Sequence, residues 1–147
     1  MSEPVQPAPI DAAVLAAVAC GGGLGAGLRY WLTLRIPVRP AGFPWATFFA
    51  NTLGCLAIGI LMVIITEVFA PPRLLRPFLG IGVLGGFTTF SSYSAEVRTL
   101  LESGAIGMAL GYLGGTVVTC LIAVLAGMAA TRWIAGRRGG TTQYGTS

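Results

Sequence analysis

The sequence predicts an all-α membrane protein with four transmembrane helices, a break in the third helix, and an antiparallel dual-topology homodimer. Of its 147 residues, 54% are hydrophobic and 10% are charged, whereas soluble domains average about 25% charged residues. The charges also separate four uncharged segments, each close to or above the roughly 20 residues that cross a bilayer as a helix. These segments are residues 12–28, 40–66, 77–95 and 103–131.

Residues 10–135 are predicted to form a single four-helix transmembrane domain. Disordered tails are predicted at 1–9, which is rich in proline, and at 136–147, which is rich in glycine and threonine. The first tail carries Glu3 and has no basic segment, so the first helix is not expected to be a cleavable signal peptide. Because little soluble mass remains, the function is expected to lie inside the membrane.

The composition excludes most enzyme chemistry. Histidine is absent and all nine basic residues are arginine, which removes Ser-His-Asp and Cys-His catalysis, histidine metal sites and the P-loop lysine. The net charge of +4 comes from arginines scattered between apolar segments, not from a patch that would bind nucleic acid. Cys20, Cys55 and Cys120 each lie alone in an apolar run, and they are interpreted as small packing residues.

The arginines in the connecting segments determine the orientation of the helices, because short loops rich in basic residues stay on the cytoplasmic side. With four spans, five arginines lie on the side of both termini and four lie on the opposite side. The two sets are Arg73, Arg76, Arg132, Arg137 and Arg138, and Arg29, Arg35, Arg39 and Arg98. This balance predicts insertion in both orientations and an antiparallel homodimer, although an obligate accessory partner is an alternative explanation.

The first segment ends at Arg29, which Tyr30 and Trp31 follow. An arginine at this position is expected to extend its side chain to the lipid–water interface. Glycines at four-residue spacing occur in the first, third and fourth segments and predict close helix contacts. The most persuasive of these is the run of Gly107, Gly111 and Gly115, because chance placement of 22 glycines also produces isolated pairs.

The second segment contains a single amide, Asn51, with Thr47 one helical turn before it. An asparagine in a transmembrane helix commonly forms a hydrogen bond to a neighbouring helix. It can also donate hydrogen bonds into a pore. The residue by itself leaves both interpretations open.

The third segment is predicted to break, because the adjacent glycines Gly85 and Gly86 weaken a helix. Backbone that is not helical at membrane depth must be buried in protein or line a watery cavity, and its free carbonyls suit a small cation. The alternative is a kinked helix whose hydroxyls bond to its own carbonyls. The hydroxyl-bearing residues after the glycines are Thr88, Thr89, Ser91, Ser92, Tyr93 and Ser94.

Two further groups complete the polar inventory. Phe90 and Tyr93 share a helix face, where they either pack against other helices or direct their positive ring edges at a small anion. In the fourth segment, a sparse polar stripe either lines a path or bonds across a dimer. Its members are Tyr112, Thr116, Thr119 and Cys120. None of the four segments has a central carboxylate, which argues against a proton-coupled carrier.

Taken together, these stretches resemble the CrcB/Fluc family of fluoride channels. The matching stretches are GGGLGAGLRYW from Gly21, FPWATFFANTLGC from Phe43 and GVLGGFTTFSSYSAE from Gly82. The resemblance covers the chain except for its tails. It implies a fluoride-selective channel in the inner (plasma) membrane that passively exports fluoride, and an antiparallel homodimer with two pores and a central structural sodium ion. Fluoride, lipid and a second copy of the chain are the implied partners.

The resemblance also implies roles for individual residues. Gly85 and Thr88 would bind sodium through their backbone carbonyls. Seven residues would line the fluoride pore: Asn51, Thr89, Phe90, Ser91, Tyr93, Tyr112 and Thr116. The chain departs from the family at Tyr93, where a second phenylalanine is usual, and at Cys120, where a serine is expected. Two other functions remain as alternatives: a small dual-topology, proton-coupled exporter of organic cations, and a membrane assembly subunit that transports nothing.

Overall fold

The computed structural model describes residues 11–37, 42–68 and 71–139, and every regular element in these ranges is helical. This result confirms the all-α class. In chain order the elements are α1 (Ala12–Arg35), α2 (Trp45–Val63), η1 (Ile64–Val68), η2 (Pro77–Leu84), α3 (Gly85–Phe87), α4 (Phe90–Glu102) and α5 (Ile106–Gly139). The two η elements are π-helical.

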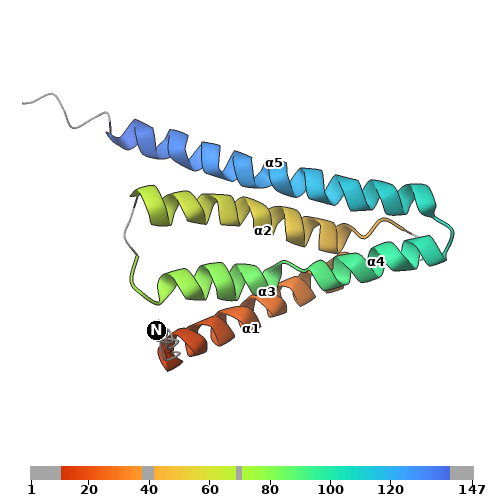
Figure 1. Ribbon diagram of the computed structural model, residues 1–147, viewed down its shortest axis with the longest axis horizontal. Coiled ribbons are helices and arrows are strands. Elements are labelled where there is room, and N and C mark those ends of the chain that lie inside the picture. The colour runs from red at the N-terminus through yellow and green to blue at the C-terminus, as the bar shows by residue number, and fades with distance from the viewer. Residues whose placement is uncertain (1–10, 38–41, 69–70, 140–147) are drawn as a thin grey trace, which may run out of the picture.

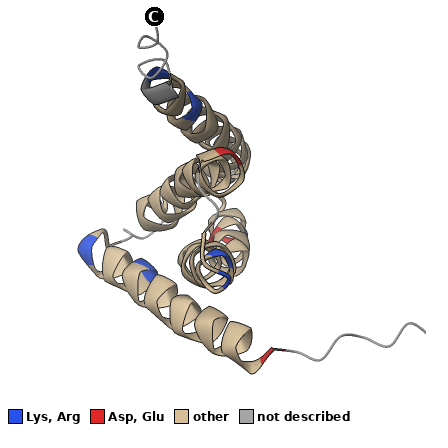
Figure 2. Ribbon diagram, turned by 90° about the vertical axis from the view of Figure 1, so that its left-hand side faces the viewer, with Lys and Arg blue, Asp and Glu red and all other residues tan. Residues whose placement is uncertain are grey.

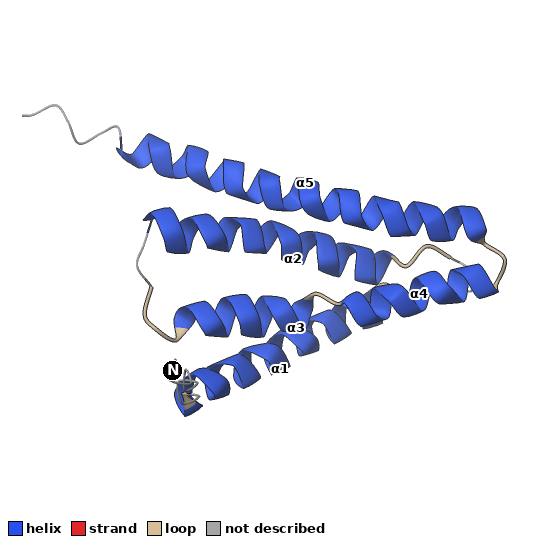
Figure 3. Ribbon diagram, in the orientation of Figure 1, coloured by secondary structure: helices blue, strands red, loops and turns tan. Residues whose placement is uncertain are grey.

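α2, α5 and the segment from η2 to α4 lie side by side, and α1 crosses them obliquely (Figures 1 and 2). α2 continues directly into η1, and it packs most extensively against α5. The elements η2, α3 and α4 follow one another along a single interrupted rod, and α1 packs against η2 and α3. The loop that interrupts this rod is visible between α3 and α4 in Figure 3.

Within residues 11–37, 42–68 and 71–139, three helices are long and apolar enough to cross a membrane: Ala12–Arg35, Trp45–Val68 and Ile106–Arg137. They correspond to the first, second and fourth uncharged segments. The third segment lies across η2, α3 and the start of α4, so its interruption keeps it from forming one long apolar helix. Many large apolar side chains are exposed, among them Leu121 and Leu125, which suits a surrounding solvent as apolar as leucine itself. The chain is an all-α membrane protein.

Close helix approach occurs at some of the predicted glycines. A Cβ at Gly21 or Gly25 would collide with the carbonyl oxygens of Phe78 and Val83, respectively, and a Cβ at Gly86 would collide with that of Gly22. Because glycine has no Cβ, it allows the backbones of α1 and the interrupted rod to touch.

The three glycines predicted to make helix contacts in α5 do not touch another helix in the described part of the chain. A Cβ added at Gly107, Gly111 or Gly115 would meet nothing within 4 Å in the described part of the chain. The close contact of α5 lies further along, at Gly127, whose added Cβ would press on the carbonyl oxygen of Leu56 in α2. Spacing alone did not distinguish these glycines, because both kinds occur on the same helix.

Charged residues are few on the helices (Figure 2), and two ion pairs join different elements where helices begin or end. Asp11 caps α1, since its side chain accepts a hydrogen bond from the amide of Ala13 at 2.9 Å, and it also pairs with Arg73. Glu67 pairs with Arg132 at 2.7 Å.

The predicted boundaries of the tails need one correction. The helix of the fourth segment, α5, runs to Gly139, so residues 136–139 are helical where a disordered tail was predicted. The guanidinium of Arg137 lies 3.5 Å from the ring centroid of Trp133, one turn earlier, and such a cation–π contact supports the last turn. The first predicted tail (1–9) and residues 140–147 lie outside the described residues.

Candidate functional site

The interruption in the third rod lies at Thr88 and Thr89, both of which have extended backbone. The helix is continuous through Gly85 and Gly86, so the predicted position of the break was wrong by a few residues. Gly86 is needed where α1 and this rod touch, as described above. The break itself is determined by a side chain from another helix.

That side chain is Asn51 of α2. Its Nδ2 donates to the carbonyl oxygen of Thr89 at 3.0 Å, and its Oδ1 accepts from the amide of Thr89 at 2.8 Å. In an uninterrupted helix the Thr89 amide would donate to the carbonyl of Gly85. Asn51 therefore replaces helical partners of the rod, and its interpretation as an interhelical anchor is confirmed.

Threonine hydroxyls complete the local structure of the break. The Oγ1 of Thr88 donates to the carbonyl of Leu84 at 2.9 Å, which is the back-bonding considered as an alternative to a break. The Oγ1 of Thr89 accepts from the amide of Ser92 at 3.2 Å and caps α4. The segment thus has both a break and a back-bonded hydroxyl.

The side chain of Arg29 reaches this break and does not simply extend to an interface. Its Nε donates to the carbonyl of Gly86 at 3.3 Å, and its Nη1 donates to the Oγ of Ser92 at 3.4 Å. These bonds join the end of α3 to the start of α4 from the side of α1. The expectation of snorkelling missed these partners, because they lie more than 50 residues away in the sequence.

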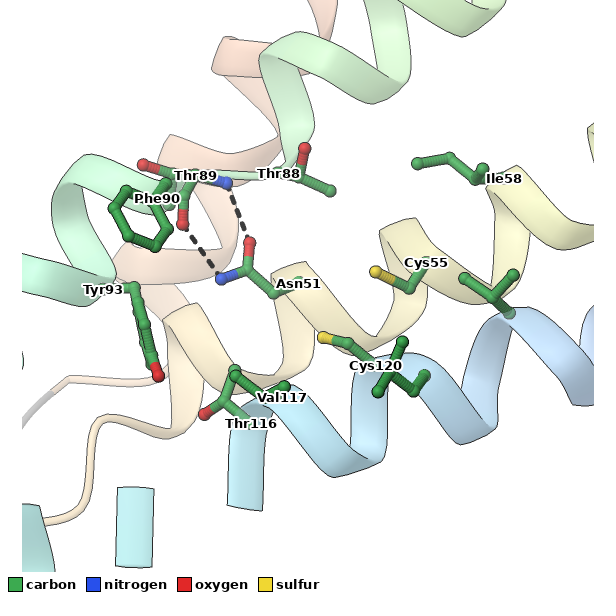
Figure 4. A pocket seen from close by; sticks show the side chains of 12 residues that line it. Asn51, Cys55, Ile58, Thr88, Thr89, Phe90, Tyr93, Thr116, Val117 and Cys120 are labelled. Carbon is green, nitrogen blue, oxygen red and sulfur yellow. Dashed lines mark hydrogen bonds between the residues drawn. The ribbon is translucent and has the colours of Figure 1, made fainter. Parts of the chain in front are cut away.

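A cavity of about 370 Å³ lies beside the break, between α2, α4 and α5 (Figure 4). Polar groups converge near Asn51, whereas the rest of the wall is largely apolar, as is usual for binding sites of small ligands. The lining residues are Asn51, Cys55, Ile58, Thr88, Thr89, Phe90, Tyr93, Thr116, Val117, Cys120, Leu121 and Val124. Six of the nine predicted site residues are among them.

Two hydrogen-bond donors at this cavity have unused capacity. The amide nitrogen of Asn51 carries two N–H groups, of which one donates to Thr89. Thr116 is only 4% exposed, and its Oγ1 has no hydrogen-bond partner among the described residues. A buried hydroxyl without a partner costs about 1–3 kcal/mol, and in the single chain the Thr116 oxygen is closed off from the cavity.

The aromatic pair also borders the cavity, with ring centroids 5.8 Å apart. Phe90 is 79% exposed in the chain, which is inconsistent with core packing inside one subunit. Tyr93 is buried, and its hydroxyl donates to the backbone carbonyl of Leu113 at 2.7 Å. The hydroxyl is therefore committed to α5, and the ring is the part of Tyr93 available to the cavity.

Three predicted site residues do not line the cavity. Gly85 is exposed and helical. Ser91 is exposed, and its hydroxyl lies 3.2 Å from that of Thr89. Tyr112 is fully buried next to Tyr93, and its hydroxyl donates to Glu96 Oε2 at 2.7 Å.

Glu96 is a residue that the sequence analysis missed. It accepts from the hydroxyl of Thr47 at 2.7 Å as well as from Tyr112, so three helices meet at this carboxylate. It lies one position beyond the third uncharged segment, so it is not one of the residues to which the absence of a central carboxylate applies. A usable signal existed, because Tyr93, Glu96 and Leu100 share one helix face and its two apolar members are buried.

These features define a small helical membrane protein in which an interrupted helix and a cavity with neutral hydrogen-bond donors form the site. A family model described as CrcB-like protein, Camphor Resistance (CrcB), matches residues 16–128. The chain belongs to this family.

Named relatives agree with that assignment. The chain is 56% identical over 136 residues to the fluoride-specific ion channel FluC 2 of Nocardia farcinica, covering 92% of this chain and 97% of the relative. It is 51% identical over 123 residues to FluC 1 of Streptomyces coelicolor, covering 83% and 80%. It is 46% identical over 118 residues to FluC 2 of Thermobifida fusca, covering 80% and 87%. The family resemblance stated from the sequence motifs is confirmed.

Proposed function

We propose that this chain is a fluoride-selective ion channel that passively exports fluoride and so lowers its concentration in the cytoplasm. The family and the names of the relatives support this function. The observation that carries it is the cavity beside the break, which Asn51 lines with one N–H not used by Thr89. The protein is a transport protein and not an enzyme.

The chemistry of the cavity suits a small anion. A pore must replace the water around fluoride with donors, yet bind the ion weakly enough for it to leave. The second N–H of Asn51 and the hydroxyl of Thr116 are neutral donors, so they can hydrogen-bond fluoride without the strong attraction of a buried cation. The positive ring edges of Phe90 and Tyr93 add a weak attraction at the rim of the same cavity.

Passive export needs no energy-coupling residue. A negative cytoplasmic potential drives an anion outward by about 2.3 kcal/mol per charge for each 100 mV. In this proposal Thr89 at the cavity and the exposed Ser91 beside it belong to the polar path. Tyr112, whose hydroxyl donates to Glu96, stays a predicted pore residue. The multi-pass location is the inner (plasma) membrane, where the potential acts directly on the cytoplasmic pool of fluoride.

The functional assembly in this proposal is an antiparallel dual-topology homodimer of four-span subunits in a lipid bilayer. The interrupted rod of η2, α3 and α4 makes the third crossing. The five-to-four balance of arginines supports insertion in both orientations. The exposure of Phe90 in a single chain also fits a pore that a second copy completes.

A structural sodium ion, held by the backbone carbonyls of Gly85 and Thr88, belongs to the same proposal. Carbonyl oxygens are ligands that replace the hydration shell of a small cation. The Thr89 amide is engaged by Asn51, so the carbonyl of Gly85 lacks its usual helical donor. Thr88 is extended and outside the helix. When bound, the ion would supply positive charge that holds two broken rods together.

An exporter of organic cations is the main alternative, and Glu96 is the observation that favours it. Such a carrier exchanges protons at an acid inside the membrane. Both oxygens of Glu96 already accept hydrogen bonds, however, and none of the residues lining the cavity is acidic. The cavity therefore suits an anion better than a cation.

Efflux from proteoliposomes tests the proposal. Vesicles loaded with fluoride or chloride salts are reconstituted with the purified chain, and a potassium ionophore supplies the counter-current. We expect rapid fluoride efflux and chloride efflux no faster than from protein-free vesicles. Fluoride retention equal to that of protein-free vesicles contradicts the channel function and favours an assembly subunit. Proton-coupled uptake of an organic cation would support the exporter.

A further inference from the structure

Two thiols lie on the wall of the cavity, opposite one another at the contact of α2 and α5 (Figure 4). Cys55 and Cys120 are both free and partly buried. The side chain of Cys120 neighbours that of Cys55. The third cysteine, Cys20, is exposed on α1 and is not part of the cavity wall. Each cysteine lies alone in the sequence, but two separate helices bring Cys55 and Cys120 together. Their interpretation as small packing residues stays a prediction.

We propose that Cys55 and Cys120 bind one soft, thiophilic divalent metal cation between them, of the class of Hg²⁺, and that the bound ion closes the fluoride path. Thiolates select soft metals, and two facing thiols provide the ligands of a two-coordinate site. The metal-binding part of this proposal depends only on the two thiols facing each other across the contact of α2 and α5. The closure rests on the proposed channel function.

The chemistry of the site is a ligand exchange. A mercuric ion binds both sulfurs as two Hg–S bonds form and both thiols release a proton. No electron is transferred, and no oxidant is needed. The product of a divalent ion and two thiolates is neutral, so it avoids the cost of placing a net charge among apolar helices. Metal ligands must be deprotonated, so binding releases protons to the solvent.

The position of the pair explains why the ion would close the path. Cys55 lies one turn after Asn51 on α2, and Cys120 lies one turn after Thr116 on α5. One helical turn is about 5.4 Å. An ion between the sulfurs thus occupies the cavity that Asn51 lines, next to the position where a fluoride ion would bind.

Mercuric ion and the full chain in proteoliposomes provide the test. In a Cys20→Ser chain only the facing pair remains. We expect one mercury per chain by mass spectrometry, a mercury–thiolate absorbance band, and loss of fluoride efflux that dithiothreitol reverses. The second Hg–S bond forms within one molecule, so the pair should resist a competing monothiol on the order of 100-fold better than a single thiol.

The matched controls are Cys20→Ser/Cys55→Ser and Cys20→Ser/Cys120→Ser, each compared with its own untreated efflux. The metal site is overturned if either single-thiol chain holds mercury against the monothiol as firmly as the pair does. The closure is overturned if the pair binds mercury and its efflux is unchanged. Mercury binding by a chain that conducts no fluoride before treatment supports the site and contradicts the channel function.

Discussion

Asn51 anchors the break, and its side chain keeps one donor for the pore role proposed above. One N–H and the carbonyl oxygen of its side chain hold the extended backbone of Thr89, and the other N–H remains for a ligand in the cavity. Anchoring and donation are compatible because a primary amide carries two donors and an acceptor. The site therefore depends on a residue that also maintains the break.

The first prediction replaces this amide. In Asn51→Asp the acceptor for the Thr89 amide remains, but both N–H donors are lost and an ionised carboxylate repels an anion. We expect fluoride efflux to be lost, and the carbonyl of Thr89 left without its partner to cost about 1–3 kcal/mol of stability. Efflux and dimer recovery by size-exclusion chromatography measure the two effects. Normal efflux in this variant would limit Asn51 to its anchoring role.

The second prediction concerns the exposed ring of Phe90. Since Phe90 is 79% exposed, Phe90→Ile removes little packing within the subunit, and we expect normal folding and assembly. An aliphatic side chain has no quadrupole to attract an anion, so fluoride efflux should fall sharply. Efflux equal to that of the parent protein would show that the ring edge has no part in the pore.

The third prediction concerns Tyr93→Phe, which removes a hydroxyl and keeps the ring, whereas Phe90→Ile removes a ring. The hydroxyl donates to the carbonyl of Leu113, and it is the ring that faces the cavity. Removing the hydroxyl should cost about 1 kcal/mol of stability and leave efflux equal or higher. Thermal unfolding and efflux are measured together. A large loss of efflux with little change in stability would instead assign the hydroxyl to the pore.

At the scale of elements, the interrupted rod is held in place from both sides. α2 supplies Asn51 to its extended residues, and α1 supplies Arg29, which bonds to Gly86 and Ser92 across the break. The contact with α1 also requires glycine where the two backbones touch. The geometry of the break is thus a property of three elements, and the sequence of the rod alone predicts only that one exists nearby.

The fourth prediction tests this contact between elements. In Gly86→Ala the new Cβ would collide with backbone atoms of Gly22, which cannot move aside as a flexible side chain can. Overpacking of this kind costs about 1–3 kcal/mol. Gly23→Ala is the matched control, because its Cβ would meet nothing within 4 Å in the described chain and alanine favours a helix.

Unfolding midpoints in detergent and fluoride efflux should both separate the two variants. Gly86→Ala is expected to lower the midpoint and the efflux, whereas Gly23→Ala should keep both near those of the parent protein. Equal behaviour of the two variants would mean that the α1 contact adapts to a side chain.

At the scale of the whole molecule, two ion pairs between different elements lie at one end of the bundle. Asp11 with Arg73, and Glu67 with Arg132, join different elements at the end where α1 begins. Exposed ion pairs of this kind contribute little to stability. Their arginines nevertheless count in the balance that determines insertion.

The fifth prediction is dual topology. Because the arginine counts of the two sides differ by one, a tag at the C-terminus should be labelled from both sides of the membrane in comparable amounts. Impermeant reagents added to intact and to permeabilised cells measure the two populations. A tag accessible from one side only would eliminate the antiparallel dimer.

Composition and the spacing of charges by themselves determined the membrane class, the positions of the apolar helices and the absence of histidine chemistry. These features depend on summed properties of long segments, which neighbouring helices do not change. The motifs around Asn51 and Thr88 also led directly to the correct family. The break was expected from local glycines, but its position was not.

The tertiary structure alone decided which side chains meet. It moved the break to Thr88 and Thr89, gave Arg29 its partners, and brought Cys55 and Cys120 together on one cavity. It also joined Glu96 to Thr47 and Tyr112. In each case, the partners come from different helices. Their contacts depend on how the helices pack, which local patterns in one sequence do not determine.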